Sequence, residues 1–223
     1  MPDLLFPKLS PAWGIKRTMA MSTQVSRAPS GRRVAVQFQQ YPRWNFQLQL
    51  LSLSSDGVVH SPNIYDDFNS LLGLMLQAGG RAKTFLFSAR DYNSVAGQAL
   101  TILTDDSGNK FSPVRYSIGP FTDMVTDLNG AIVVRDNGVV KTLGTDFILQ
   151  TGVTSSTFSE PGLIIAWQSG HNPTGPVTAD FAFYYRCAFT SESVNDSTPP
   201  SFENWIQNYW KVPLEFESEF DNA

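Results

Sequence analysis

Apolar and polar residues alternate along a short stretch near the start of the chain. From Trp44 to Leu50 every second residue is apolar, and the residues between them are Asn45, Gln47 and Gln49. A period of two predicts a strand with one face in a core. The other face carries amides in place of the usual Lys and Glu, and amides can be buried where their hydrogen bonds are met. We therefore expect that face to meet other protein.

The same alternation occurs just upstream, where Val34, Val36 and Phe38 alternate with Ala35 and two glutamines. This pattern predicts a second half-buried strand after a turn at 30–31. The two strands are separated near Pro42, which has no N–H to give to a ladder. Residues 1–30, rich in Pro, Ser and Met, are expected to form an extended arm with one short strand at 18–25.

The pattern changes to a helical period in residues 61–80. Ser61 is expected to cap the helix, with Pro62 in its first turn, and Gly79-Gly80 to end it. The predicted core-facing stripe consists of Ile64, Phe68, Leu71, Leu72, Met75 and Leu76.

Further strands are expected at 83–91, 146–150, 162–167, 178–189 and 211–220, with a hairpin turning at Asp136-Asn137-Gly138. Many short strands and one helix predict a mainly β fold, a β-sandwich with one packed helix. Residues 94–175 are less regular. The expected organisation is a sandwich domain formed by 1–93 and 176–223, interrupted by a β-rich lobe with a hairpin at 94–175.

Composition narrows the functional classes. Charged residues make up 16% of the 223 residues, and the net charge is −4. A low charge content favours a surface covered by partners, and the negative balance argues against nucleic acid recognition. No apolar run is long enough to cross a membrane, and no secretory signal is visible. The lone Cys187 is expected to be a small buried residue on a strand.

No catalytic or cofactor-binding motif is apparent. His60 and His171 lie in separate turn regions, too few for a typical zinc site and without a nucleophile elbow nearby. Asp66 with Asp67 is better explained by a helix start, and Asp105-Asp106 by a turn. We therefore expect no enzymatic activity, no metal and no cofactor.

Several segments resemble one family in the same order. They are FPKLSPAWGIKRTMAMSTQVSRAPSGRRVAVQFQQYPRWNFQLQL at the start, the helix ending in GG, FLFSARDYNSVAGQAL, and the closing ADFAFYYRCAF and KVPLEFES. The chain resembles the distal tail proteins of long-tailed phages, in particular the type found in prophages and gene transfer agents. The likeness is strongest over residues 6–50.

This resemblance implies a structural subunit of the phage tail tip. Such proteins form a ring, typically a homo-hexamer, with a β-sandwich like that of the tail tube subunits. The ring joins the tail tube protein to the baseplate hub protein and the receptor-binding parts. The implied location is the distal end of the tail in the virion, after synthesis in the host cytoplasm.

The expected subunit interface consists of arginines and glutamines on the two alternating strands: Arg32, Arg33, Gln37, Gln39, Arg43, Gln47 and Gln49. Two alternatives remain at this point. One is a carbohydrate-binding β-sandwich that contacts the host surface through Trp167 or Trp205. The other is a hydrolase that uses carboxylates such as Asp66 and Asp105.

Overall fold

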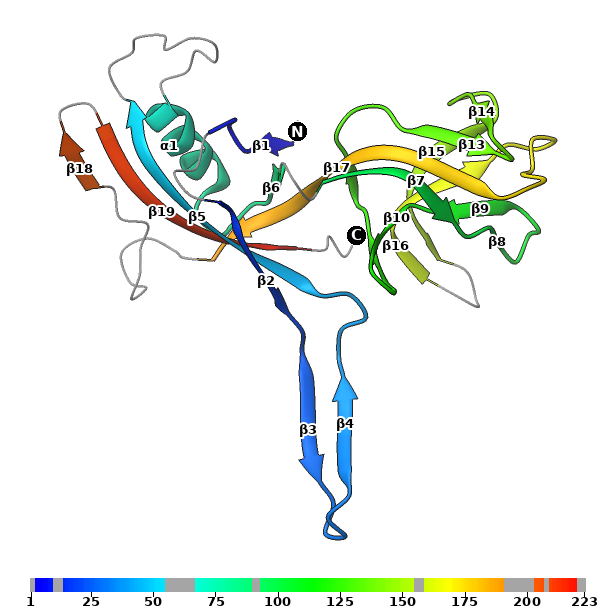
Figure 1. Ribbon diagram of the computed structural model, residues 1–223, viewed down its shortest axis with the longest axis horizontal. Coiled ribbons are helices and arrows are strands. Elements are labelled where there is room, and N and C mark those ends of the chain that lie inside the picture. The colour runs from blue at the N-terminus through cyan, green and yellow to red at the C-terminus, as the bar shows by residue number, and fades with distance from the viewer. Residues whose placement is uncertain are drawn as a thin grey trace. The chain divides into compact units, whose positions relative to one another are not determined.

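The computed structural model describes residues 3–9, 14–54, 67–89, 93–154, 159–190, 203–206 and 209–219 (Figure 1). Over these residues the chain is mainly β, with one helix, which confirms the predicted fold class. The chain divides into two compact units. Unit 1 comprises residues 1–87 and 187–219, and unit 2 comprises residues 88–186. In the described part of the chain, no helix is long and apolar enough to cross a membrane.

Unit 1 is formed around a sheet whose strands follow the order β1-β6-β17-β19-β5-β2. β18 pairs with β19, and β3 pairs with β4 as a separate hairpin. The elements of unit 1 are β1 (Leu4–Leu5), β2 (Lys16–Ala20), β3 (Thr23–Arg27), β4 (Arg33–Gln37), β5 (Arg43–Ser54), α1 (Asp67–Ala78), β6 (Phe85–Phe87), β18 (Glu203–Ile206), β19 (Tyr209–Ser218) and the last three residues of β17 (Val177–Phe189).

The core of unit 1 is aromatic. The alternating residues of β5 that were expected to be buried, from Trp44 to Leu50, are all at most 8% exposed. Phe46 packs against Phe87 and Phe216, with ring centroids 5.1 and 5.6 Å away. Cys187 is fully buried as expected, and burial together with the charge of Glu219 raises the pKa of its thiol.

The helix α1 ends at its two glycines, as the sequence predicts. Gly79 and Gly80 have φ of 62° and 67°, a left-handed conformation that glycine adopts without steric cost. Their N–H groups donate to the carbonyls of Leu76 and Met75 at 3.2 and 3.3 Å, which satisfies two C-terminal carbonyls. The expected N-cap at Ser61 lies outside the described residues.

The buried stripe of α1 differs from the expected one. Leu76 is 72% exposed, whereas Leu71, Leu74 and Ala78 are at most 6% exposed. These three residues are spaced by three and four, so they lie on one helix face. The sequence contains enough leucines for two overlapping stripes, and packing of α1 against β1 and β5 selects the one with Leu74.

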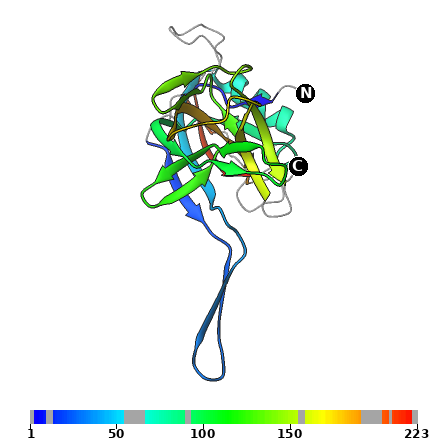
Figure 2. The same cartoon turned by 90° about the vertical axis from the view of Figure 1, so that its right-hand side faces the viewer.

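The strand predicted over 34–39 forms, but it is not half-buried. It is β4, which pairs with β3 and with no other described strand, and the two form the hairpin arm, residues 22–38 (Figures 1 and 2). Each side chain of β3 and of β4 is exposed. Val34, Val36 and Phe38 are 44%, 49% and 62% exposed, so the expectation of a core-facing strand is wrong there. Alternation specifies a two-faced strand, but it does not say what covers the apolar face.

Unit 2 consists of short strands. One sheet has the order β15-β16-β9-β8, β10 pairs with β11, and β17 pairs with β7, β12 and β13. The elements are β7 (Ser94–Leu100), β8 (Leu103–Thr104), β9 (Lys110–Pro113), β10 (Arg115–Ile118), β11 (Phe121–Met124), β12 (Asp127–Leu128), β13 (Val133–Asp136), β14 (Val139–Lys141), β15 (Phe147–Thr154), β16 (Ser159–Trp167) and Val177–Arg186 of β17.

Residues 94–126 are more regular than the sequence suggested, because they contain β7 to β11. These strands have two to seven residues, too few for a clear period, and left-handed glycines such as Gly97, Gly108 and Gly119 interrupt them. The hairpin predicted at Asp136-Asn137-Gly138 is confirmed. Asn137 and Gly138 both have positive φ, 49° and 81°, as a type I′ turn requires.

Candidate subunit interface

The solvent side of the β2–β5–β19 sheet carries the amides that the sequence singled out. Gln47 lies between Lys16 of β2 and Glu215 of β19, and Asn45 lies between Thr18 and Glu217. We call the surface formed by Lys16, Thr18, Asn45, Gln47, Gln49, Glu215 and Glu217 the outer face. It is continuous across three hydrogen-bonded strands.

The charges of the outer face are ordered from strand to strand. A cation lies on β2, uncharged amides on β5, and two carboxylates on β19. The Gln47 amide donates a hydrogen bond of 2.9 Å to Glu215 Oε1. On this face the side chains of β5 itself carry no charge. The neighbouring strands place a cation on one side of them and carboxylates on the other.

Arg43, another residue of the expected interface, is engaged within its own chain. Its guanidinium Nη1 lies 3.5 Å from Glu219 Oε1, and both side chains are partly exposed. Beside it the Trp44 backbone N–H donates to the Ser218 hydroxyl at 2.8 Å. These contacts join the start of β5 to the end of β19.

The hairpin arm has two different faces, set by its register. Val36 pairs with Gln24 and Val34 with Ser26, which places Val34, Val36 and, two residues on, Phe38 on the apolar face. The opposite, polar face consists of Thr23, Val25, Arg27, Arg33, Ala35 and Gln37. Arg32 lies in the turn at the tip.

The base of the arm is fixed by two glutamines of the expected interface. Gln37 donates its amide to the Gln39 carbonyl at 2.5 Å, and Gln39 Oε1 accepts from the Ser22 N–H at 3.1 Å. The seven expected residues therefore occupy two places. Arg32, Arg33, Gln37 and Gln39 belong to the arm or its base, and Arg43, Gln47 and Gln49 belong to β5.

Sequence reasoning missed Glu215 and Glu217 as parts of this surface. A signal was present in the last strand, where Leu214 and Phe216 alternate with Glu215 and Glu217. That alternation gives the charged face of β19, but it cannot give the partner strand. Only the antiparallel register of β19 with β5 brings these carboxylates beside the amides.

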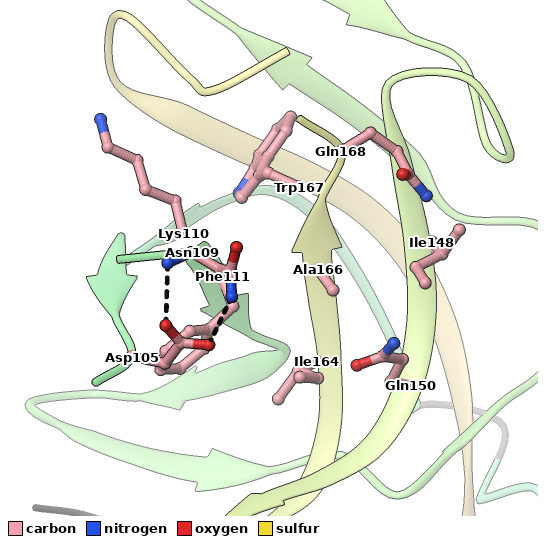
Figure 3. A pocket seen from close by; sticks show the side chains of 10 residues that line it. All are labelled: Asp105, Asn109, Lys110, Phe111, Ile148, Gln150, Ile164, Ala166, Trp167 and Gln168. Atoms are coloured by element: carbon pink, nitrogen blue, oxygen red, sulfur yellow. Dashed lines mark hydrogen bonds between the residues drawn. The ribbon is translucent and has the colours of Figure 1, made fainter. Parts of the chain in front are cut away.

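Unit 2 contains a pocket of about 220 Å³ beside Trp167 (Figure 3). Trp167 is 6% exposed and donates its indole N–H to the Ser112 hydroxyl at 3.2 Å. The indole is therefore a core residue, and it offers no stacking surface for a sugar. The side chain of Trp205 lies outside the described part of the structure, as do Asp66 and His60.

The acidic residue of this pocket, Asp105, stabilises a turn. It accepts from the backbone N–H groups of Ser107 and Asn109 at 2.9 and 2.8 Å, and from the Asn109 amide at 3.0 Å. Hydrogen bonds from Asn109 are the main reason that the pKa of Asp105 is lowered. Its carboxylate oxygens are thus occupied by the turn that the sequence predicted there.

His171 is paired with one carboxylate. Its Nδ1 lies 2.8 Å from Asp146 Oδ1, and Asp146 also accepts from the Thr142 N–H at 2.7 Å. The ring makes no hydrogen bond to a serine within the described ranges. Over the same ranges, no group of three His, Cys, Asp or Glu side chains is placed to hold a metal ion.

Stability of unit 2 is expected to fall in acid through Asp136. Burial by itself raises the pKa of this carboxyl, but N–H donors from Gly175 and Thr174 and the charge of Lys141 lower it overall. Because the pKa of Asp136 is lower in the folded state than its usual value of 3.8, the ionised carboxylate stabilises the fold at pH values above 3.8. This stabilisation is lost as the pH falls through the folded-state pKa. Urea unfolding at pH 6 and pH 3 should show a smaller loss for Asp136→Asn than for wild type. Identical losses would contradict this assignment.

Comparison with known proteins gives no identification. The sequence matches no protein-family model, and no curated protein matches it significantly. The family resemblance of the opening segments therefore remains a prediction.

Proposed function

We propose that this chain is a structural subunit of a closed ring, and that the ring lies at the distal end of a phage tail. In this proposal the ring joins the tail tube protein to the baseplate hub protein, and the chain acts by binding, with no enzymatic role. The resemblance over residues 6–50 supports the place in a tail. The exposed apolar face of the hairpin arm supports assembly.

The arm is the observation that carries this proposal. A lone two-stranded hairpin is only marginally stable in water, and this one presents Val34, Val36 and Phe38 on one side, each at least 44% exposed. Exposed apolar surface of this kind is typical of protein contacts. Each copy also presents an outer face, which is a different surface. A contact between two different surfaces generates a ring when its rotation closes.

The oligomeric state of the purified chain tests the proposal. We expect light scattering after size exclusion to give the mass of a closed oligomer, a hexamer in the family that the chain resembles. Negative-stain electron microscopy should show rings. A monomer that persists at high protein concentration would contradict the proposed function. Co-purification with the tail tube and hub proteins of the same phage would then place the ring within the tail.

A further inference from the structure

Charge is distributed very unevenly along this chain. Residues 4–55 contain seven of the 16 Lys and Arg and none of the 20 Asp and Glu. This stretch therefore carries a net charge of +7, and the remainder of the chain carries −11. One copy of the protein thus offers both a cationic segment and an anionic remainder, so a second copy supplies a surface complementary to the arm.

The tip of the arm carries cations without partners. Arg27 and Arg33 lie directly opposite each other on the polar face, and Arg32 is their neighbour in the turn. None of the three side chains forms an ion pair with a described residue. Like charges directly opposite each other destabilise a two-stranded ribbon, so this arrangement favours a hairpin that meets carboxylates elsewhere.

The outer face carries a matching pair of carboxylates. Glu215 and Glu217 are two residues apart on one side of β19, so their Cα atoms are about 6.6 Å apart. In the described parts of the chain, the Glu215 carboxylate accepts only from the Gln47 amide, and the Glu217 side chain has no partner. By contrast, the nearby Glu219 is already paired with Arg43.

We propose that the arm tip of one copy lies on the outer face of a second copy, where Arg27 and Arg33 pair with Glu215 and Glu217. This inference rests on the proposed ring and names the contact made by the polar face of the arm. The apolar face is on the other side of the β3–β4 ribbon and is left to meet a different surface of the ring. The spacing fits, because Cβ atoms of directly opposed strand residues are about 5 Å apart, and guanidinium groups can bind carboxylates through two hydrogen bonds. The polar face of the arm also suits the amides and threonine of the outer face.

The contact lies between two copies because the tip is far from its own β19. Arg27 follows the end of β2 by seven residues, and an extended strand advances about 3.3 Å per residue. The tip therefore lies on the order of 20 Å beyond β2 and β5, in the direction the arm takes in Figure 1. In this arrangement the tip is too far from the carboxylates of its own β19 to pair with them.

Reversal of charge on each side, followed by mixing, tests the contact. One variant carries Arg27→Glu and Arg33→Glu, and the other carries Glu215→Arg and Glu217→Arg. Each variant alone places like charges in every contact, so its association should weaken by more than about tenfold. An equimolar mixture should recover the wild-type oligomer mass. The two variants then alternate around the ring, and each arm meets an outer face of opposite charge. Light scattering gives the mass, and circular dichroism checks the folding of each variant.

The matched control reverses two exposed cations outside the arm and the outer face, Arg81→Glu with Lys83→Glu. It changes the net charge as much as the arm variant does, and it should assemble like wild type. Suppose that wild type forms an oligomer. The inference is then wrong if both reversed variants also assemble, or if a mixture of two dissociated variants stays dissociated. In either case the ring proposal stands. A wild-type monomer overturns both. Loss of binding to phosphate-rich nucleic acid in the arm variant, with unchanged assembly, would assign the cations to that partner instead.

Discussion

Replacing Phe216 with alanine is expected to lower the free energy of unfolding of unit 1 by roughly 3–5 kcal/mol, the usual cost of removing a buried phenylalanine. Phe216 is fully buried on β19. Its ring is at the centre of the aromatic core and has five aromatic neighbours within 6.3 Å between centroids, namely Phe6, Phe46, Phe85, Phe87 and Phe189.

The effect of Phe216→Ala should be large because these neighbours cannot all move into the space. Four of them are on β5, β6 and β17, and Phe6 follows β1, where its N–H donates to the Leu86 carbonyl at 2.9 Å. Close-packed cores relax only partly around a cavity. A loss of roughly 3–5 kcal/mol is a large fraction of the stability of a typical domain, about 5–15 kcal/mol, so unit 1 of the variant should unfold far more often than that of wild type.

Hydrogen exchange measured by mass spectrometry separates the two units. Peptides from β5 and β19 should exchange faster in Phe216→Ala, while peptides from β16 keep their protection. The matched control is Leu76→Ala, because Leu76 belongs to the same unit, is 72% exposed, and its truncation should change stability by less than about 1 kcal/mol. Equal effects of the two substitutions would show that the aromatic core does not hold unit 1 together.

The second large effect is expected on assembly. Val34→Asp with Val36→Asp should abolish the oligomer while the monomer stays folded. Both valines are on the apolar face of the arm and are 44% and 49% exposed, so the substitutions remove no core packing. In a contact, however, two unpaired carboxylates would be taken out of water, which costs several kcal/mol for each ion that remains buried.

The control for the arm variant uses valines of similar exposure in unit 2. Val139 and Val140 are 63% and 59% exposed on β14, and Val139→Asp with Val140→Asp adds the same charge. Sedimentation velocity should show a monomer for the arm variant and a wild-type oligomer for the β14 variant. An arm variant that still assembles would exclude the apolar face of the arm from the ring contact.

Local pattern predicted several features of this fold because their causes are local. The alternation from Trp44 to Leu50 specifies one buried face, and Phe46 and Leu50 are fully buried. Glycines ended α1 because only they adopt its left-handed terminus easily. Asn137 and Gly138 formed their hairpin turn for the same reason. In each case the deciding interactions lie within a few residues of one another.

Other features depended on contacts between distant segments. Leu74, and not Leu76, lies in the core because α1 packs against β1 and β5. The sequence of the helix alone does not specify that packing. Val34, Val36 and Phe38 have the same alternation as the core strand, yet they are exposed. Among the described residues their strand pairs only with β3, and no second layer covers it.

The sequence by itself determined a mainly β chain with one helix, a low surface charge and a polar second face on β5. The strand period and the turn residues depend on positions close together in the sequence, and the charge content follows from composition alone. Only the tertiary structure decided that this second face is flanked by Lys16 on one side and by Glu215 and Glu217 on the other. Gln47 and Glu215 are 168 positions apart and become neighbours through strand register, and register is set by the packing of the whole sheet.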